Sequence, residues 1–186
     1  SELSSKHVKG NRAIDRFDAR ASFTTWIHRI AINCSLKKSS GEDSSTDAMI
    51  EVLREHFAAA DVEISETIRI ADHNVLPGVT SDEGDGDDWP ALREKILSHD
   101  ILIFGGPIWM GQIGSIAKRV LERMDAFLSE TDDQGRMPSF SKVAVAAIVG
   151  NEDGAHWASA QLFHTIVAHN PAGYDCAGEA LTSGGF

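Results

Sequence analysis

The sequence predicts one α/β domain built on a doubly wound, mostly parallel sheet. Apolar runs of strand length alternate with segments of helical periodicity from about residue 27 onward, as expected for right-handed βαβ units. A chain of 186 residues is long enough for one such core. Its apolar fraction of 42% and charged fraction of 24% are those of an ordinary globular protein.

Local patterns predict each element in turn. Strands are predicted within residues 26–34, 61–70, 100–106 and 142–150, and the last two runs are apolar throughout, as in strands buried on both faces. Helices are predicted over residues 46–60, 89–100, 116–130 and 155–170. Ser44 or Ser45 can cap the first helix, and Pro90 is tolerated in the first turn of the second. Residues 1–26 are an N-terminal extension, and residues 27–186 form the domain.

The third predicted helix has two faces. Its apolar stripe is expected in the core, and its charged residues are expected to face solvent. The stripe consists of Val120, Leu121, Met124 and Phe127, and the charged face of Lys118, Arg119, Glu122 and Arg123. The Gly-, Pro- and Asp-rich residues 73–88 before the second helix are expected to form a long solvated loop.

Charge and cysteine content limit the possible functions. A net charge of −11 disfavours a general binder of nucleic acid or of anionic membranes. The two cysteines, Cys34 and Cys176, form no C-x-x-C motif, which favours a reducing compartment such as the cytoplasm. No apolar run approaches about eighteen residues, and no signal peptide is recognisable.

Three segments leave the carboxyl ends of predicted strands, where parallel sheets bind ligands: residues 35–45, 107–115 and 150–156. The first is rich in hydroxyl and ammonium donors and ends at a helix N-terminus, which favours an anion such as a phosphate monoester. It contains neither G-x-x-x-x-G-K-[ST] nor G-x-G-x-x-G. The alternative is an ordinary polar turn with an N-cap.

The second and third segments carry other chemistry. Trp109 and Met110 lie between glycines and can flank a planar ring, although a core or dimer-contact tryptophan is the alternative. Glu152, Asp153 and His156 suit metal binding or acid–base chemistry, but no HExxH motif accompanies them and no metal is expected. Asp153 is expected to cap the last helix instead.

Together these segments resemble the flavodoxin-like NAD(P)H-dependent FMN reductases and related quinone reductases, over Ile30 to about Asn170. The resemblance lies in INCSLKKSSGEDSSTDAM, PGVTSDEGDGDDWPALREKIL, ILIFGGPIWMGQIGSIAKRVLERMDAFL and VGNEDGAHW. It implies a five-stranded sheet of order 2-1-3-4-5, here with an incomplete fifth strand near the C-terminus. No compact cysteine cluster is present, so an iron–sulfur centre is excluded.

The resemblance also implies a set of FMN contacts. The FMN phosphate would be held by Ser35, Lys37, Ser44, Ser45 and Thr46. The isoalloxazine would be bordered by Pro107, Ile108, Trp109, Met110 and Gly111, and on its other side by Gly150, Asn151, Glu152, Gly154 and His156.

The implied activity is transfer of electrons from NADH or NADPH, through FMN, to a small acceptor such as a quinone or free flavin. His156 is the candidate proton donor, with a purely structural histidine as the alternative. A cytoplasmic homodimer or homotetramer is implied, with no membrane or nucleic-acid partner. Trp157 and Phe163 are candidate residues of the subunit interface.

Two other functions are considered. The first is an FMN-binding electron carrier or a regulator without enzymatic activity, which would not oxidise NAD(P)H steadily without a partner reductase. The second comes from RFDARASFTTWIHRIAIN, which resembles the promoter-melting helix of extracytoplasmic-function sigma factors. That DNA-binding hypothesis requires residues 27–33 to be helical, whereas the domain hypothesis requires them to be a strand.

Overall fold

The computed structural model describes residues 27–41, 43–168 and 181–184. The predicted N-terminal extension, residues 1–26, lies outside them. The strands are β1 Arg29–Asn33, β2 Glu66–Arg69, β3 Ile101–Trp109, β4 Gln112–Ile113, β5 Val143–Gly150 and β6 Leu181–Gly184. The α-helices are α3 Ser45–Ala58, α4 Trp89–Ser98, α5 Ser115–Met124 and α6 Ala155–Ala168, and the short 3₁₀ helices are η1 Ile70–Asp72 and η2 Asp125–Leu128.

The strands form one sheet in the order β2-β1-β3-β5-β6, and every neighbouring pair in this order is parallel. The short strand β4 pairs antiparallel with the end of β3 and lies off this path. Without β4, the order is 2-1-3-4-5, so the predicted topology is confirmed. The fifth strand, expected to be incomplete, is the four-residue β6 beside β5.

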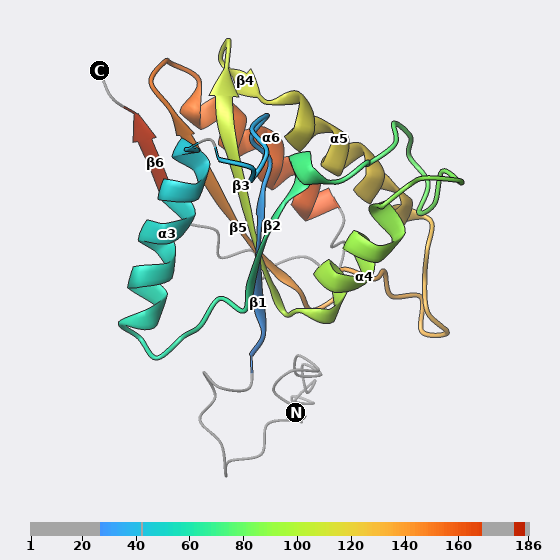
Figure 1. Ribbon diagram of the computed structural model, residues 1–186. Helices are drawn as coiled ribbons and strands as arrows, with labels where there is room; N and C mark the ends of the chain where they lie inside the picture. The colour runs from blue at the N-terminus through green and yellow to red at the C-terminus, as the bar shows by residue number, and fades with distance from the viewer. Residues whose placement is uncertain (1–26, 42, 169–180, 185–186) are drawn as a thin grey trace, which may run out of the picture.

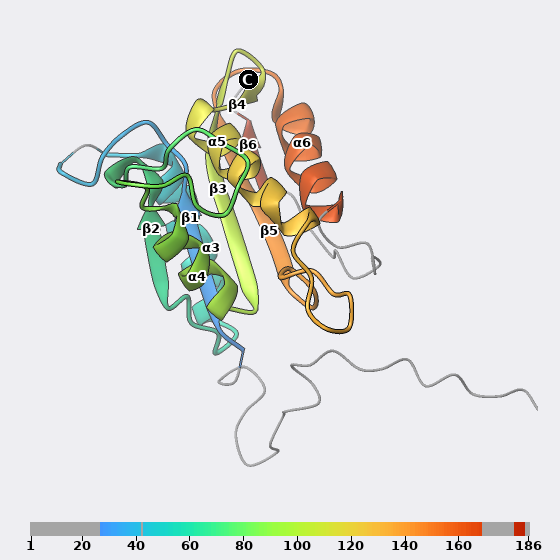
Figure 2. The same ribbon diagram turned by 90° about the vertical axis from the view of Figure 1, so that its right-hand side faces the viewer.

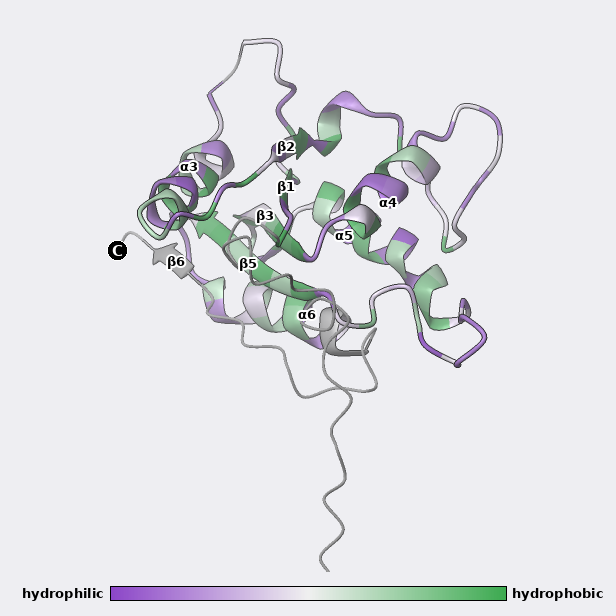
Figure 3. Ribbon diagram, turned by 90° about the horizontal axis from the view of Figure 1, so that it is seen from below, coloured by the Kyte–Doolittle hydropathy of each residue, from purple (hydrophilic) through white to green (hydrophobic). Residues whose placement is uncertain are grey.

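Helices cover both faces of the sheet, as Figure 2 and Figure 3 show: α3 lies on one face, and α4, α5 and α6 lie on the other. Because side chains alternate along a strand, β1 contributes to both cores. Ile30 and Ile32 belong to the larger cluster, which includes Trp89 of α4. Ala31 packs with Ile50 of α3 on the opposite face. No helix among the described residues is long and apolar enough to cross a bilayer.

Residues 29–33 are a strand, so the hypothesis of a sigma-factor helix over residues 27–33 is wrong. All five residues of β1 are buried, and the strand pairs with β2 on one side and β3 on the other. A helix here would remove the central pairing of the sheet. The second predicted strand is shorter than expected, because only Glu66–Arg69 of residues 61–70 pairs with β1.

Arg123 was expected on the solvent-facing side of α5, and this is wrong because its side chain is 0% exposed. Its guanidinium forms an ion pair with Asp87 at 2.7 Å and donates to the carbonyl oxygens of Thr80 (3.0 Å) and Leu76 (2.9 Å). It also lies over the ring of Trp89, 5.8 Å from the ring centroid. The loop of residues 73–88 therefore folds back onto α5.

Asp87 is the anionic anchor of this loop, and its side chain is fully buried. Burial by itself raises the pKa of Asp87, but Arg123 and the backbone N–H groups of Glu83, Trp89 and Leu76 outweigh that effect and lower the pKa to about 2. The N–H groups lie 3.0–3.2 Å from the carboxylate oxygens. The sequence predicted that this loop is solvated. The buried side chain of Asp87 shows that part of it is not.

Replacing Asp87 with Asn should lower the free energy of unfolding by about 2–3 kcal/mol, because it leaves the buried Arg123 without a counter-charge. The carboxylate's pKa is lowered to about 2 from 3.8, so its contribution is complete above about pH 4 and disappears as the pH falls through about 2. The measurement is urea denaturation of both proteins between pH 7 and pH 2, where the difference should shrink below pH 4.

Asp85→Asn is the matched control, since Asp85 is exposed in the same acidic loop. It should change stability by less than about 0.5 kcal/mol. Equal losses in the two variants would contradict the anchoring role of Asp87.

Candidate functional site

Three loops meet at the carboxyl edge of the sheet, at the top of Figure 1. They follow β1, β3 and β5, whose carboxyl ends lie side by side in register, with Asn33 opposite Gly105 and Gly105 opposite Ala147. The backbone N–H of Cys34 continues this pairing by donating to the carbonyl of Gly105 at 2.8 Å. The fold thus brings together the three segments that the sequence singled out.

The first loop, residues 34–44, is closed by the buried amide of Asn33. Its Oδ1 accepts a hydrogen bond from the N–H of Ser35 at 2.8 Å. Its Nδ2 donates to the hydroxyl of Ser44 at 3.4 Å and to the carboxylate of Asp47. One side chain therefore ties the start of the loop to its end.

Two residues from other elements, Arg69 and Asp72, hold the outer part of this loop. Arg69, at the end of β2, donates to the carbonyl of Lys38 at 2.9 Å and forms an ion pair with Asp47. Asp72, in η1, accepts from the N–H of Ser39 at 3.0 Å, and its hydrogen bonds with Ser39 lower its pKa. Sequence analysis missed Asn33, Arg69 and Asp72. The available signal was that each lies at, or just beyond, the carboxyl end of a predicted strand.

The start of α3 provides anion-binding groups. Ser44 is the N-cap, and its hydroxyl accepts from the N–H of Asp47 at 3.4 Å. Thr46 is only 1% exposed, and its Oγ1 has no hydrogen-bond partner among the described residues. A buried hydroxyl without a partner, beside the N–H groups of a helix N-terminus, suits a phosphate.

An open hollow of about 690 Å³ lies against this loop. It is lined by Ser39, Gly41, Asp43, Ser44, Ser45, Asp47, Ala48 and Arg69. Ser35 is buried, whereas Lys37 and Ser45 are exposed. The ammonium of Lys37 donates to the carbonyl of Asp43 at 2.6 Å. Of the five predicted phosphate contacts, Ser44 and Ser45 line this hollow, whereas Ser35, Lys37 and Thr46 are not among its lining residues.

The second loop is a β-hairpin, whereas an irregular loop was expected over residues 107–115. β3 continues to Trp109 and turns through Met110 and Gly111 into β4. Met110 and Gly111 have φ angles of +51° and +74°, as a two-residue turn of type I′ requires. Trp109 is 55% exposed and Met110 87% exposed, so the alternative of a core tryptophan is wrong. Pro107 is half-buried, and the side chain of Ile108 is buried.

The third loop, residues 151–154, contacts this hairpin directly. The carboxylate of Glu152 accepts from the N–H of Met110 at 2.9 Å. Gly154 has a φ of +112°, and a Cβ there would lie 2.5 Å from the Cα of Gly111. The backbones of the two loops are therefore in contact, and only glycine fits at Gly154.

Asp153 does not cap α6 as expected. Its carboxylate accepts from the N–H of Gly154 at 2.7 Å, and Gly154 is the residue before the helix. Asn151 and His156 are exposed on either side of this turn. Within the described part of the chain, no three His, Cys, Asp or Glu side chains gather closely enough to hold a metal ion.

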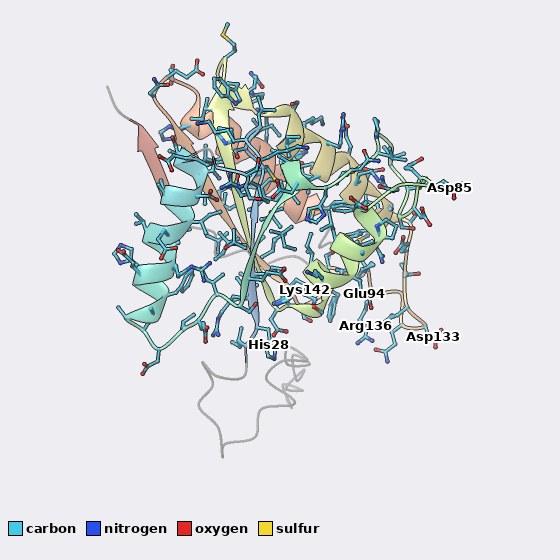
Figure 4. The ribbon with its side chains drawn as sticks, viewed as in Figure 1. His28, Asp85, Glu94, Asp133, Arg136 and Lys142 are labelled. Atoms are coloured by element: carbon cyan, nitrogen blue, oxygen red, sulfur yellow. The ribbon has the colours of Figure 1, made fainter. Side chains whose placement is uncertain are left out.

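A second hollow, of about 700 Å³, lies at the opposite edge of the sheet, where Figure 4 labels His28, Arg136 and Lys142. Its cationic groups are engaged locally: Arg136 forms an ion pair with Asp132 at 2.5 Å, and Lys142 donates to the carbonyl of Leu97 at 2.7 Å. The carboxyl edge, with its helix N-terminus and exposed hairpin, is therefore the stronger candidate.

Comparison with known proteins gives a family match and matches to proteins of different descriptions. Residues 28–174 match the family model described as NADPH-dependent FMN reductase. The chain is 34% identical over 148 residues to a Mycobacterium bovis protein described as divalent metal cation transporter MntH, which covers 75% of this chain and 21% of that protein. It is 28% identical over 149 residues to the 8-demethyl-8-aminoriboflavin-5'-phosphate synthase of Streptomyces davaonensis, covering 75% of this chain and 57% of the synthase.

Solved structures agree on the fold. RosB, solved with the bound intermediate 8-demethyl-8-formylriboflavin-5'-phosphate, superposes with a TM-score of 0.72 at 25% identity, covering 86% of this chain and 65% of RosB. The NAD(P)H:quinone oxidoreductase of Methanothermobacter marburgensis superposes with a TM-score of 0.57 at 12% identity, covering 86% and 84% of the two chains. The chain thus spans little more than half of the synthase and about a fifth of the transporter.

Gly154→Ala should displace the hairpin from the third loop, because the new Cβ meets the backbone of Gly111. Gly84→Ala is the matched control: Gly84 has a similar φ of +97°, but nothing lies within 4 Å of a Cβ there. Both variants carry the strain of a left-handed alanine, about 1–3 kcal/mol. Only Gly154→Ala should also speed amide hydrogen exchange in residues 108–113, and equal exchange in both variants would contradict the contact.

Proposed function

The chain belongs to the family of NADPH-dependent FMN reductases, and we propose that it binds FMN at the carboxyl edge of its sheet and transfers electrons from NADPH or NADH to a small acceptor. The unpartnered hydroxyl of Thr46, the second residue of α3, carries this proposal, because the N-terminus of α3 lies at the same edge of the sheet as the exposed hairpin (Figure 1). A mononucleotide has the matching chemistry, with an anionic phosphate at one end and a planar ring at the other.

In this proposal the first loop holds the phosphate. Thr46 would donate its hydroxyl, the N-terminus of α3 would contribute its partial positive charge, and the ammonium of Lys37 would add a full positive charge. Ser35 and Ser44 hold the loop together through Asn33, and Ser45 is exposed at its rim.

The hairpin and the third loop border the ring. Trp109 and Met110 present exposed side chains, whereas Ile108 is buried and borders a ring only through its backbone. The remaining proposed ring contacts are Pro107, Gly111, Gly150, Asn151, Glu152, Gly154 and His156.

FMN bound here would supply the redox chemistry, the passage of two electrons from a reduced nicotinamide to the acceptor. With a quinone the balance is NADPH + H⁺ + quinone → NADP⁺ + quinol. The chain's part is to orient the ring and to leave one of its faces accessible. His156 is exposed in the first turn of α6 and is proposed as a proton donor to the quinone oxygen.

The assembly and cellular place of the protein are also proposals. Residues 27–186 would form the FMN-binding domain. The exposed indole of Trp157 and the half-buried Phe163 favour a homodimer or homotetramer that covers them. Low cysteine use supports a reducing, cytoplasmic setting.

A second candidate function is modification of FMN itself. The support is the TM-score of 0.72 with RosB, whose structure contains a modified riboflavin phosphate, against 0.57 with the quinone oxidoreductase. In this case FMN would be consumed as a substrate, and the mass of the flavin would change during turnover. As a cofactor, FMN would be recovered unchanged.

A metal ion is a further candidate acceptor. The relative at 34% identity is described as a divalent metal cation transporter, and this chain matches about a fifth of it. Segments joined in one polypeptide act on shared molecules at high effective concentration. Reduction of ferric ion would supply a divalent cation, with the balance NADPH + 2 Fe³⁺ → NADP⁺ + 2 Fe²⁺ + H⁺.

The phosphate site is tested by comparing FMN with riboflavin, which lacks the phosphate. The unaltered protein should bind FMN at least about 100-fold more tightly. Thr46→Val keeps the shape of the side chain but removes its hydroxyl, and should reduce this ratio about tenfold. Fluorescence titration gives both affinities, and Thr131→Val, at the exposed opposite edge, is the control. A protein that binds neither flavin would overturn the proposed function; an unchanged ratio in Thr46→Val would overturn the phosphate assignment.

The acceptor is tested with FMN-loaded protein under anaerobic conditions. With a ferric chelate, each NADPH oxidised should yield two ferrous ions, and Thr46→Val should lose this activity at limiting FMN. Steady reduction of a quinone without ferrous ion formation would restrict the acceptors to organic molecules. No steady NADPH oxidation with either acceptor would favour an electron carrier.

A further inference from the structure

Gln112, in β4, joins the hairpin to α6. Its Oε1 accepts hydrogen bonds from the indole Nε1 of Trp157 at 2.9 Å and from Nε2 of Gln161 at 3.0 Å. Trp157 and Gln161 are four residues apart, so both donors lie on one face of α6. An indole N–H only donates, so the Gln112 atom facing it is the amide oxygen, and Gln161 must also donate.

The hairpin needs such support. β4 has two residues and pairs with β3 only through Ile108–Ile113 and Trp109–Gln112. A two-stranded hairpin of this length is marginally stable by itself in water. Its position must therefore be fixed by contacts with the rest of the domain.

Gln112 is also well placed to fix the position of Trp109. Residues directly opposite in an antiparallel pair project their side chains to the same face. Trp109 is opposite Gln112, so the side chain bound to α6 is the immediate neighbour of the exposed indole. Glu152 holds the turn at Met110, at the other end of the same hairpin.

We propose that Gln112 is a positioning residue that fixes the hairpin against α6 and so sets where Trp109 and Met110 lie along the flavin ring. The inference rests on the proposed function, because it assigns these two residues to the ring. Gln112 acts through the hairpin and through Trp157, not by contact with FMN. Its loss should weaken binding of the ring and leave binding of the phosphate unchanged.

The experiment again compares FMN with riboflavin. Gln112→Leu removes the shared acceptor. It should weaken the binding of FMN and of riboflavin by the same factor, about tenfold for two lost hydrogen bonds, so the ratio of the two affinities should not change. Gln112→Glu keeps an oxygen that accepts from both donors and should restore both affinities. Gln134→Leu, at an exposed glutamine in the loop after η2, is the matched control and should change neither affinity.

A second variant tests whether Gln112 acts through its hydrogen bond with Trp157 or through the overall stability of the fold. Trp157→Phe keeps an aromatic ring but removes the indole N–H, and should weaken the binding of both flavins about threefold. Combined with Gln112→Leu it should add nothing further, because the two residues act through the same bond. Flavin affinities unchanged by Gln112→Leu, or failure of Gln112→Glu to restore them, would overturn the positioning role. Failure of the unaltered protein to bind either flavin would instead overturn the proposed function.

Discussion

The first loop of the candidate site, where we propose that a phosphate binds, depends on the buried amide of Asn33. This side chain links Ser35 at the start of the first loop with Ser44 and Asp47 at its end, and Asp47 in turn pairs with Arg69 of the neighbouring strand. Buried polar networks are costly when only partly satisfied. The pairing of β1 with β2 therefore fixes the loop as well as the sheet, since it brings Arg69 within reach of Asp47.

The sequence located the main parallel strands because their signals are local, whereas their order was implied by the resemblance to a known family. β3 and β5 are apolar throughout and β1 is buried along its length, and the helices carry regular apolar stripes. The errors arose where distant segments meet. Periodicity located the charged side of α5 but could not reveal that residues 73–88 cover Arg123. Pro107 and the glycines around Trp109 suggested a loop, and the two residue pairs that make it a hairpin form only through tertiary structure.

In the candidate site, too, the features with local signals could be predicted and the contacts between distant segments could not. Its three loops could be located from the sequence, because parallel strands bring their carboxyl ends to one edge. The groups that hold those loops are the polar side chains of Asn33, Arg69 and Gln112. Apart from the contact of Asn33 with Ser35, their partners lie 11 to 49 positions away along the chain. Such contacts have no signature in a single sequence.

A chain of net charge −11 must hold anionic ligands through local groups. At physiological ionic strength charges are screened over about 8 Å, so distant carboxylates affect the approach of a ligand more than its binding. Near the first loop the charge of Asp47 is matched by Arg69, and Lys37 donates to a neutral carbonyl. Its positive charge is therefore not cancelled by that partner. The Thr46 hydroxyl, in the first turn of α3, is a buried side-chain group with no hydrogen-bond partner within the described chain. An unsatisfied buried hydroxyl costs free energy in folding, and in the proposed function a hydrogen bond to the phosphate would recover that cost.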